Sequence, residues 1–366
     1  MQNRLYFKVF NRRIYFITIY WRCRLKAQKA ISAAILVAVL VFPFGRQAST
    51  QQFTIKFATV APEGSTWMNL MREYDAAVRD ESGGRLRFKI YGGSSQGEDN
   101  VVLRKIRLGQ LHSAGLTGVG LGEIATKVRI LDSPFLFRNY EEVDYLYEKL
   151  DKEFREAFEE NDYMLLGWAE VGFVYVFTNT PVRTIGDMSG VRMWIWEGDP
   201  VAEATFKALN VNPIPLSVID VLTSLQTGLI DGAYTSPLAA IALQWFTRVK
   251  YMMGVPIADA SGAVVVSKKT FDSLPQDLQE ILLRNGRKYM RKLTEKSREE
   301  NASSIKTLER NGIQVIDVSS PKTLKEYVDA GEKARRTLVG QLYDQAFLDR
   351  VEKILSEYRA HRSSSK

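Results

Sequence analysis

The chain has 366 residues, of which 45% are hydrophobic and 25% are charged, a composition typical of a globular protein with two or three domains. The formal net charge of +8 comes from the first 50 residues, which contain nine basic and no acidic residues, whereas residues 51–366 carry 41 basic and 42 acidic side chains. A body this close to neutral lacks the positive surface that nucleic-acid binding requires, so we expect no nucleic-acid partner.

The N-terminal segment, residues 1–50, has the features of an export signal. Four basic residues between Arg22 and Lys29 precede residues 30–44, which are almost entirely apolar. This run is short for a membrane span but suits the core of a cleaved signal, with cleavage near residue 48. We therefore expect export to the periplasm, while a retained N-terminal membrane anchor stays open as the alternative.

In the first half of the body, short apolar strands alternate with helices. The expected strands cover residues 53–60, 86–91, 113–117 and 164–177, and the expected helices cover residues 66–81, 99–108 and 141–160. The third strand carries Thr117 to the edge of a cleft. The following Gly118-x-Gly120-x-Gly122 does not have the spacing of a dinucleotide-binding fingerprint, and we expect a loop in which the backbone approaches a ligand or a neighbour closely.

The stretch from residue 187 to residue 249 organises the second half. It alternates strands with helices: strands at residues 191–196, 211–216 and 229–235, and helices at residues 200–209, 218–226 and 237–249. This alternation predicts a parallel sheet, and such sheets bind ligands beyond the carboxyl ends of their strands, so we expect a ligand near the loops after Ile195 and Ala233. A strand at 260–267, a long helix at 275–311 with interruptions near Gly286, a short strand at 313–318 and two helices within 321–358 follow.

A helix that ends on a glycine and is followed at once by a buried strand occurs twice at a constant offset. The residues Val102, Leu103, Ile106, Gly109, Leu111 and His112 align with Val221, Leu222, Leu225, Gly228, Ile230 and Asp231. The repeat predicts two similar α/β lobes that face each other. Lobe I would comprise residues 51–172 and about 262–290, lobe II residues 173–261, and residues from about 291 to 366 would form helices packing across the lobes.

Several motifs, in this order and spacing, make the chain resemble the substrate-binding proteins of tripartite ATP-independent periplasmic (TRAP) transporters, of the dicarboxylate-binding (DctP) type. They are Phe57-Ala58-Thr59 with Pro62, Gly97-Glu98, Leu108-Gly109-Gln110-Leu111, Asp132-Ser133-Pro134-Phe135-Leu136-Phe137, Thr178-Asn179, Asp187-Met188-Ser189-Gly190 and Leu225-Gln226-Thr227-Gly228-Leu229-Ile230-Asp231-Gly232. The resemblance runs from about residue 53 to the final helices.

The resemblance implies a two-lobed α/β periplasmic binding protein fold (type II-like), with hinge strands between the lobes and long C-terminal helices. It also implies a function. The lobes would close on a small organic solute and deliver it to small and large TRAP membrane subunits that use an ion gradient, without a cofactor or a metal. Oligomeric state cannot be derived from the sequence.

The family's ligand-binding arginine, whose planar guanidinium pairs with a ligand carboxylate, falls on Trp194 in this chain. Strand alternation places Arg192, Trp194 and Trp196 on one face, so Arg192 could supply the clamp from a shifted position or could be a solvated strand end. A second family arginine is replaced by Val174 or Tyr175. We therefore expect the ligand to be something other than a simple carboxylate.

The expected ligand-binding residues are Trp194, Arg192, Trp196, Tyr175, Tyr234, Thr117 and Glu170. Aromatic faces near carboxylates, here Glu170, Glu197 and Asp199, favour a cationic or amine-bearing ligand, although a carboxylate bound through Arg192 stays open. Plainer roles are also open. Asp199 before Pro200 suits a helix N-cap, Trp196 and Phe177 suit a hinge core, and Glu170 is either a ligand contact or half of an internal ion pair.

An enzyme of this architecture is the less favoured alternative. The only cysteine, Cys23, precedes the apolar run of the signal, so the exported body has no thiolate nucleophile and no disulfide. Of the two histidines, His112 occupies the repeat position of Asp231 and is expected to be structural. The motifs of serine hydrolases, zinc proteases and phosphate-binding loops are not found in the sequence. A sensory binding module is the remaining alternative, and no signalling domain supports it.

Overall fold

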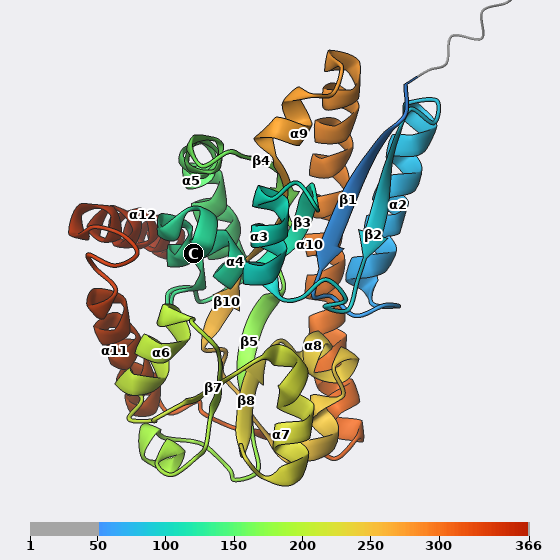
Figure 1. Ribbon diagram of the computed structural model, residues 1–366. Coiled ribbons are helices and arrows are strands. Elements are labelled where there is room, and N and C mark those ends of the chain that lie inside the picture. Colours follow the sequence, from blue (N-terminus) through green and yellow to red (C-terminus); the bar gives the residue numbers. More distant parts are fainter. Residues whose placement is uncertain (1–50, 365–366) are drawn as a thin grey trace, which may run out of the picture. The chain divides into compact units, whose positions relative to one another are not determined.

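The computed structural model describes residues 51–364 and contains mixed β-sheets covered by helices (Figure 1). The first sheet has the strand order β2-β1-β3-β11-β4. Its strands are β1 (Phe53–Thr59), β2 (Leu86–Tyr91), β3 (Ser113–Thr117), β4 (Tyr163–Trp168) and β11 (Gly262–Ser267). β1 is parallel to β2 and β3 because helices connect these strands, whereas β11 is antiparallel to β3 and β4.

Each face of the first sheet carries its own hydrophobic cluster. Alternation along β1 directs Ile55 and Phe57 to one cluster and Ala58 to the other. The helices around this sheet are α2 (Thr66–Glu81), α3 (Asp99–Arg107), α4 (Gly118–Ile124), η1 (Thr126–Asp132), α5 (Tyr140–Glu160), α9 (Lys268–Asp272) and α10 (Gln276–Arg310). The first cluster is covered by α2 and α10 and the second by α3, α4 and α5, so both faces of the sheet are buried.

The second sheet is built around β5 (Gly172–Thr178), which enters it directly after β4. Its other strands are β8 (Gly232–Thr235), β9 (Tyr251–Met253), β10 (Ala258–Ala260) and β12 (Gln314–Ile316). β5 is antiparallel to β8, β9 and β10. A separate parallel pair consists of β6 (Trp194–Trp196) and β7 (Ile214–Leu216).

The parallel arrangement expected between residues 187 and 249 is confirmed for the strands of that stretch: β6 pairs with β7, and Met193, next to β6, forms a parallel bridge with Gly232 of β8. The sequence did not predict that β8 also pairs with β5 in the antiparallel sense. The physical reason is that β5 arrives from the first sheet, so its direction is set by that crossing and not by a helix within the second half of the chain. Alternation of helices and strands along 187–249 could not reveal a partner that precedes this stretch.

The second sheet is flanked by short helices. They are η2 (Ile185–Met188), α6 (Pro200–Ala208), η3 (Val218–Asp220), α7 (Val221–Thr227), α8 (Pro237–Ala242) and η4 (Trp245–Arg248). The single helix expected at residues 237–249 is divided because Gln244 has a left-handed φ of 58°. The two repeat glycines behave as expected, since Gly109 and Gly228 follow α3 and α7 with φ values of 71° and 70°.

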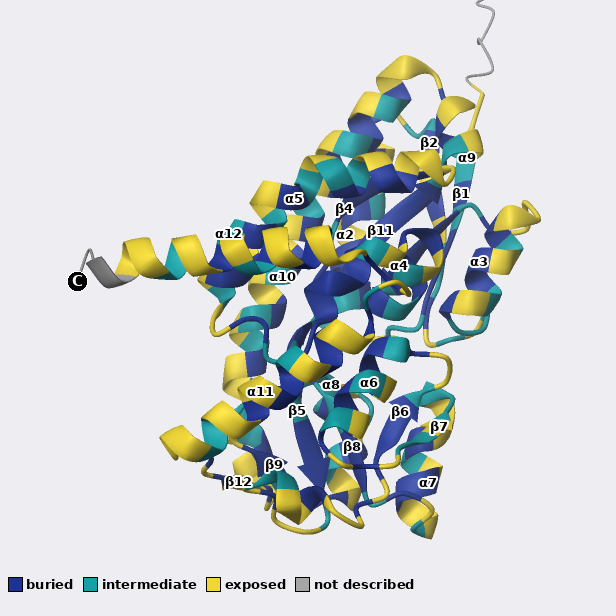
Figure 2. Ribbon diagram, turned by 90° about the vertical axis from the view of Figure 1, so that its left-hand side faces the viewer, coloured by how far each residue is buried: buried dark blue, intermediate teal, exposed yellow. Residues whose placement is uncertain are grey.

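The long helix α10 packs against elements of both sheets, including β4, β5 and α8, and Figure 1 shows it beside both. The final helices α11 (Pro321–Thr337) and α12 (Gln345–Ser364) pack on α6 and α5, respectively. Figure 2 shows buried strands and exposed residues on the outer helix faces. The chain thus has the two-lobed α/β architecture with long C-terminal helices. β12, which follows α10, joins the second sheet, and the exact lobe limits stay a prediction.

The expected export signal, residues 1–50, lies outside the described residues. Within residues 51–364, no helix combines the length and the apolar character that crossing a membrane requires.

Candidate ligand-binding cavity

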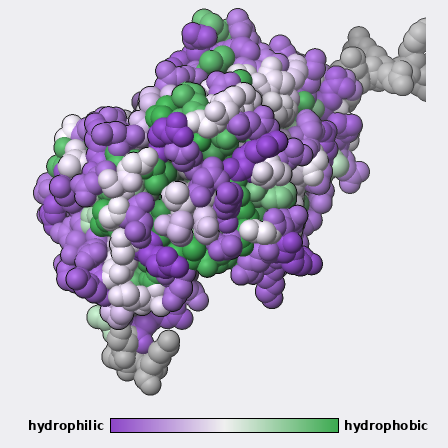
Figure 3. Space-filling model, turned by 90° about the horizontal axis from the view of Figure 1, so that it is seen from below, coloured by the Kyte–Doolittle hydropathy of each residue, from purple (hydrophilic) through white to green (hydrophobic). Residues whose placement is uncertain are grey.

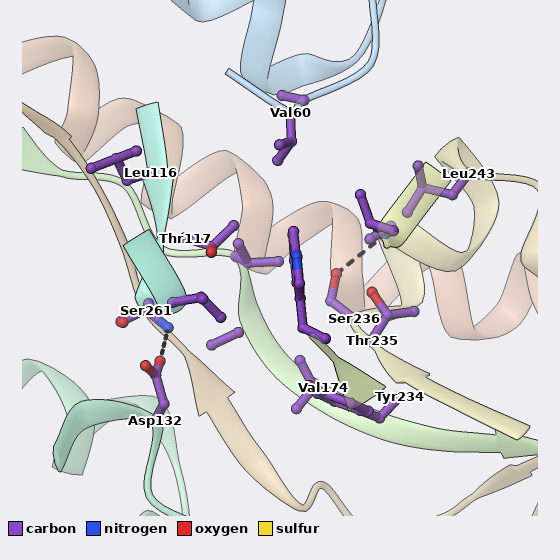
Figure 4. A pocket seen from close by; sticks show the side chains of 18 of the residues that line it. Val60, Leu116, Thr117, Asp132, Val174, Tyr234, Thr235, Ser236, Leu243 and Ser261 are labelled. Carbon is purple, nitrogen blue, oxygen red and sulfur yellow. Dashed lines mark hydrogen bonds between the residues drawn. The ribbon is translucent and has the colours of Figure 1, made fainter. Parts of the chain in front are cut away.

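A cavity of about 490 Å³ is bordered by elements of both sheets. The loop after β1 and the end of β3 contribute from the first sheet, and β6, α6 and α8 contribute from the other half. The crossing segments contribute Val174 and Ala258, which lie opposite each other in the β5–β10 pair. Figure 4 shows Val60, Thr117, Val174 and Leu243 around the same space. The volume is in the range of cavities that bind small organic molecules.

Part of the wall is aromatic, and Trp194 contacts three of its other rings. Its ring stacks on Tyr234 with centroids 5.2 Å apart, meets Trp245 edge-on at 5.2 Å and lies 6.0 Å from Trp196. Its indole Nε1 donates to the Leu216 carbonyl at 2.9 Å, which fixes the ring against β7. Only 2% of Trp194 is exposed, so its ring is both part of a packed aromatic cluster and part of the cavity wall.

Trp67, at the start of α2, adds an aromatic surface from the first lobe. It stacks on Phe57 with centroids 6.2 Å apart and lies against β3. A β-carbon built at Gly115 would overlap the Trp67 ring, so the missing side chain on β3 makes room for it. Trp67 and Trp245 were not predicted as cavity residues. Their positions in the sequence follow no strand or helix periodicity that would predict a cavity residue, because Trp67 lies at the start of α2 and Trp245 in the short 3₁₀ helix η4.

The polar part of the wall is centred on Arg129, which is 3% exposed. Its Nη2 lies 2.5 Å from Asp199 Oδ1, and its Nη1 lies 3.2 Å from Asp132 Oδ2. Burial by itself lowers the pKa of the guanidinium, but the charges of Asp199 and Asp132 outweigh burial and raise it. Asp132 Oδ1 also accepts a hydrogen bond from the Ser261 backbone at 2.6 Å, as Figure 4 shows. Arg129 is therefore engaged by two carboxylates through Nη1 and Nη2, while its Nε has no hydrogen-bond partner among the described residues.

Asp259, on β10, is a third carboxyl group among the cavity-lining residues. It is fully buried, and neither of its oxygens has a hydrogen-bond partner among the described residues. Burial raises the pKa of this carboxyl well above its ordinary value, and the nearby charges of Glu170 and Asp132 raise it further. A buried carboxyl group without partners costs stability, which makes Asp259 an unusual feature of this wall.

The three glycines after β3 let this polar group approach the first lobe. They lie in helix α4, not in the loop that was expected, so that part of the prediction is wrong. The close approach itself is confirmed. A β-carbon at Gly118 would overlap the Asp132 carboxylate, one at Gly120 would lie 2.7 Å from Asp99 Oδ2, and one at Gly122 would lie 2.6 Å from Arg129 Cδ. The neighbours are side chains of the protein, and only glycine leaves room for them.

Thr117 lies at the cavity edge, as expected, and is held there by Asp99. Its backbone N–H and its hydroxyl both donate to Asp99 Oδ2, at 2.9 and 2.7 Å. Burial raises the pKa of Asp99 to about 6, although the hydrogen bonds from Thr117 act in the opposite direction. Since the Thr117 hydroxyl proton is used in this bond, its oxygen faces any ligand as an acceptor.

Of the seven expected ligand-binding residues, four line the cavity: Trp194, Trp196, Tyr234 and Thr117. Contact of these four with a ligand stays a prediction. Both expected loops, after Ile195 and after Ala233, border the cavity. Tyr175, Arg192 and Glu170 are not among the lining residues.

The positions of Arg192 and Glu170 have clear physical causes. Arg192 precedes β6 and forms two 2.7 Å hydrogen bonds to Asp231, and 51% of its side chain is exposed. It occupies a solvated strand end, one of the two alternatives. Glu170 is paired with Arg298 of α10 through bonds of 2.8 and 2.6 Å, the internal ion pair that was the alternative to a ligand contact. Tyr175 packs between two hydrophobic clusters on β5.

Glu98, directly before α3, links the two halves. It accepts hydrogen bonds from Trp196 Nε1 and from the Val218 backbone, each 2.8 Å long, and from the Ser217 hydroxyl. Together with the pair between Arg129 and Asp199, this contact joins elements around the first sheet to β6, η3 and α6. The structure is thus a closed arrangement of the two lobes.

The surface in Figure 3 is mostly hydrophilic, with small hydrophobic patches.

Comparisons with known proteins agree with this architecture. The model of the family "Bacterial extracellular solute-binding protein, family 7" (DctP) matches residues 57–337. A solute-binding protein of Verminephrobacter eiseniae is 26% identical over 244 residues, which cover 66% of this chain and 72% of that protein. The C4-dicarboxylate-binding periplasmic protein DctP of Vibrio cholerae is 24% identical over 310 residues, covering 81% of this chain and 90% of that protein.

Among solved structures, a TRAP periplasmic solute-binding protein from Ralstonia eutropha, with bound (S)-2-acetolactate, superposes with a TM-score of 0.78. The two sequences are 21% identical, and the match covers 83% of this chain and 99% of that chain. This likeness concerns the fold. Because the family model spans most of the described residues, the chain belongs to family 7 of the bacterial extracellular solute-binding proteins, the DctP-type solute-binding proteins of TRAP transporters.

Proposed function

We propose that the protein is a periplasmic receptor that captures a small organic solute in the cavity and delivers it to small and large TRAP membrane subunits driven by an ion gradient. One observation carries the proposal: in a chain of this family, a cavity of about 490 Å³ is bordered by elements of both lobes. A receptor of this kind needs no catalytic group, and its family is one of solute-binding proteins.

The ligand of this chain differs from a simple carboxylate. Relatives are named for such ligands, for example C4-dicarboxylates in the Vibrio cholerae protein and D-glucuronate in a structure from Pseudomonas putida. Two features of the present cavity argue against a simple carboxylate. Trp194 replaces the arginine that the family resemblance implies, and Arg129, which does line the cavity, is already paired with Asp132 and Asp199.

Thermal unfolding with a panel of carboxylates, amines and neutral aromatic compounds tests the receptor function. A ligand at 100 times its Kd adds ~2.7 kcal/mol to the free energy of unfolding, which is readily seen as a rise in Tm. We expect a member of the amine or aromatic classes to stabilise the protein and Trp194→Ala to remove that effect. Stabilisation by simple carboxylates alone, retained in Trp194→Ala, would show that the ligand proposal is wrong.

Export and delivery have separate tests. Mass spectrometry of the protein recovered from the periplasm should give an N-terminus near residue 48, which is incompatible with a retained anchor. Uptake of the identified solute should require the membrane subunits and should collapse when the ion gradient is dissipated.

A further inference from the structure

The charged side chains of the cavity wall are bound by the protein itself. Arg129 contacts Asp199 and Asp132 through its two terminal nitrogens. Asp199 also accepts a hydrogen bond from the Val201 backbone at 3.0 Å, and Asp132 accepts one from the Ser261 backbone at 2.6 Å. A charged ligand would therefore have to compete with these internal bonds, whether it is an anion that pairs with the guanidinium or a cation that pairs with a carboxylate.

The atoms of this charged group that lack a hydrogen bond lie beside helix α4. Arg129 Nε has no partner among the described residues and would lie 3.7 Å from a β-carbon at Gly122. Asp132 Oδ2 lies so close to Gly118 that a β-carbon there would overlap it. Both atoms are buried within the protein, so neither presents a charge at the cavity surface.

Asp259 supplies no charge to the cavity either. It lies opposite Phe173 in the β5–β10 pair, whereas its neighbours Ala258 and Ala260 line the cavity. Because side chains alternate between the two faces of a strand, the Asp259 carboxyl group lies on the Phe173 face, and the residue borders the cavity through its backbone. Burial raises the pKa of this carboxyl well above its ordinary value, which favours the uncharged form.

The rest of the wall is mainly apolar. Most of its other residues are aliphatic or aromatic, and its rings include those of Trp67, Trp194 and Trp196. The indole N–H groups of the last two already donate to Leu216 and Glu98, at 2.9 and 2.8 Å. Such a surface favours the burial of an apolar body, and it offers nothing that replaces the water lost by a charged group.

The polar groups that remain for a ligand are neutral hydroxyls. Within residues 51–364, no hydrogen bond engages the hydroxyl of Thr235 at the end of β8 or that of Ser297 on α10, and both residues line the cavity. The Thr117 hydroxyl donates to Asp99, so its oxygen can accept. Figure 4 shows Thr117 and Thr235 around the same space. Hydroxyls of this kind pair with the hydroxyl or carbonyl groups of a ligand.

We propose that the cavity binds an uncharged solute, a compact apolar or aromatic body with a hydroxyl or carbonyl group that bonds to the hydroxyls of Thr235 and Ser297. This proposal rests on the receptor function proposed above and specifies its ligand class. An uncharged ligand leaves the internal ion pairs of the wall intact, and it loses less hydration on entering an apolar cavity than a charged ligand of the same size.

A cationic ligand, which the sequence favoured, would need a carboxylate that is free to pair with it. Glu170 is paired with Arg298 at 2.6 Å, and Asp199 is bonded to Arg129. Glu197 is exposed and does not line the cavity. None of these three carboxylates presents a free charge to the cavity, so the aromatic faces act here as apolar surface.

Sets of three ligands with one carbon skeleton test the proposal on the unaltered protein. Phenylethanol, phenylethylamine and phenylacetate form one set, and the corresponding cyclohexyl and indole compounds form two others. Calorimetric titration at neutral pH, where the amine and the carboxylate are charged, gives each Kd. We expect at least one alcohol to bind at least about tenfold more tightly than both of its charged partners, because a charged group loses its hydration without gaining a partner.

The double variant Thr235→Val and Ser297→Ala removes both free hydroxyls and leaves the hydrogen bonds of the described residues in place. It should weaken binding of the alcohol about tenfold, since two neutral hydrogen bonds are lost. The matched control, Thr223→Val with Ser303→Ala, makes the same substitutions at exposed positions outside the cavity lining and should leave the Kd unchanged. The ligand sets are compared on the wild type, so they remain decisive even if the double variant fails to fold.

The inference is overturned if no alcohol binds at least about tenfold more tightly than its charged partners. An unchanged alcohol Kd in the double variant overturns the assignment of the polar contacts to Thr235 and Ser297. Binding of amines or carboxylates alone would leave the receptor function standing, because a solute would still be captured in the cavity. Only failure of every ligand class to bind would count against the receptor function as well.

Discussion

Gly118, Gly120 and Gly122 show how single residues shape the polar wall. Each lies where a β-carbon would meet a side chain of Asp132, Asp99 or Arg129. None of the three needs a positive φ, so the demand for glycine here comes from space alone. The helix α4 can therefore pack directly on the groups that define the charge of the cavity.

Replacement of Gly118 by alanine should destabilise the protein by about 1–3 kcal/mol, because the added methyl group overlaps the buried Asp132 carboxylate. Urea unfolding measures the loss. Gly186→Ala is the matched control, since its β-carbon would lie 3.6 Å from Thr184 Oγ1, an ordinary contact, and should change stability by less than about 0.5 kcal/mol. Equal effects of the two substitutions would contradict this account.

Asp99 should leave a pH signature in the stability. Its folded-state pKa is about 6, above the ordinary value, mainly because of burial. Between pH 4 and 6 the folded state therefore binds more protons than the unfolded state, so stability falls as pH rises through this window. Glu98 adds to the rise in pKa, while Thr117 and Gly120 oppose it.

Asp99→Asn removes this titration. The free energy of unfolding of the wild type, minus that of the variant, should fall by on the order of 2–3 kcal/mol between pH 4 and 6.5. Chemical denaturation at a series of pH values measures it. A difference that stays constant across this range would show that Asp99 has an ordinary pKa.

At the residue scale, strand alternation predicts some of the cavity residues, but not all of those that lie in strands. Trp194 and Trp196 follow from strand alternation, and Thr117 from the end of its strand. Arg129 and Asp259 could not be found in this way. Arg129 lies in a 3₁₀ segment without a regular face, and Asp259 matters because of missing partners, which only three-dimensional packing reveals.

At the element scale, α10 is fixed to the crossing between the sheets by a buried ion pair. Arg298 contacts Glu170 at 2.6 Å and Asp144 at 2.7 Å, and its guanidinium lies 4.3 Å from the centre of the Tyr140 ring. Burial raises the pKa of Glu170, and Arg298 opposes that rise. Glu170 is 3% exposed, so it depends on Arg298 for its charge.

Arg298→Met should cost about 3–5 kcal/mol, because it leaves a buried carboxylate unpaired, and the double variant with Glu170→Gln should recover much of this loss. Lys292→Met on the same helix is the control. Lys292 pairs with Glu73 on the surface, where both side chains are nearly half exposed, so its loss should cost less than about 1 kcal/mol. Thermal unfolding distinguishes the two outcomes, and a loss below 1 kcal/mol for Arg298→Met would contradict the assigned role.

Most elements could be predicted because each is defined by its own periodicity and caps. The limits of the helices at residues 66–81 and 276–310 were expected within one residue. The interruption expected near Gly286 was wrong, because α10 continues through this glycine, which lies close to the Leu166 carbonyl. What periodicity could not supply was strand direction and interruption. β8 is antiparallel to β5 because the chain crosses from the first sheet into the second at β5. The positive φ of Gln244 ends α8, and a glutamine side chain gives no sign of such a backbone angle.

At the scale of the whole molecule, Glu98 should stabilise the closed arrangement. Its carboxylate accepts three hydrogen bonds from Trp196, Ser217 and Val218. Opening the lobes would break all three hydrogen bonds, and in the open form water would hydrate the Glu98 carboxylate instead. Hydrogen bonds to a charged group contribute about 1.5–3 kcal/mol, so this contact can shift the balance between open and closed forms.

Glu98→Gln should therefore weaken ligand binding by roughly 5- to 30-fold, corresponding to about 1–2 kcal/mol of closure energy, without any loss of direct ligand contact. Calorimetric titration with the compound of the panel that stabilises the protein most provides the Kd. Glu123→Gln, at an exposed position of α4, is the matched control and should bind normally. An unchanged Kd in Glu98→Gln would mean that this contact does not favour closure.

The central claim is that the two lobes close around a captured solute. Small-angle X-ray scattering tests it most directly, with the protein recovered from the periplasm and measured with and without the most stabilising compound of the panel. The account predicts that the ligand lowers the radius of gyration to the value calculated from the closed structure. A radius of gyration that does not change at saturating ligand, and already equals the closed value without it, would contradict the account.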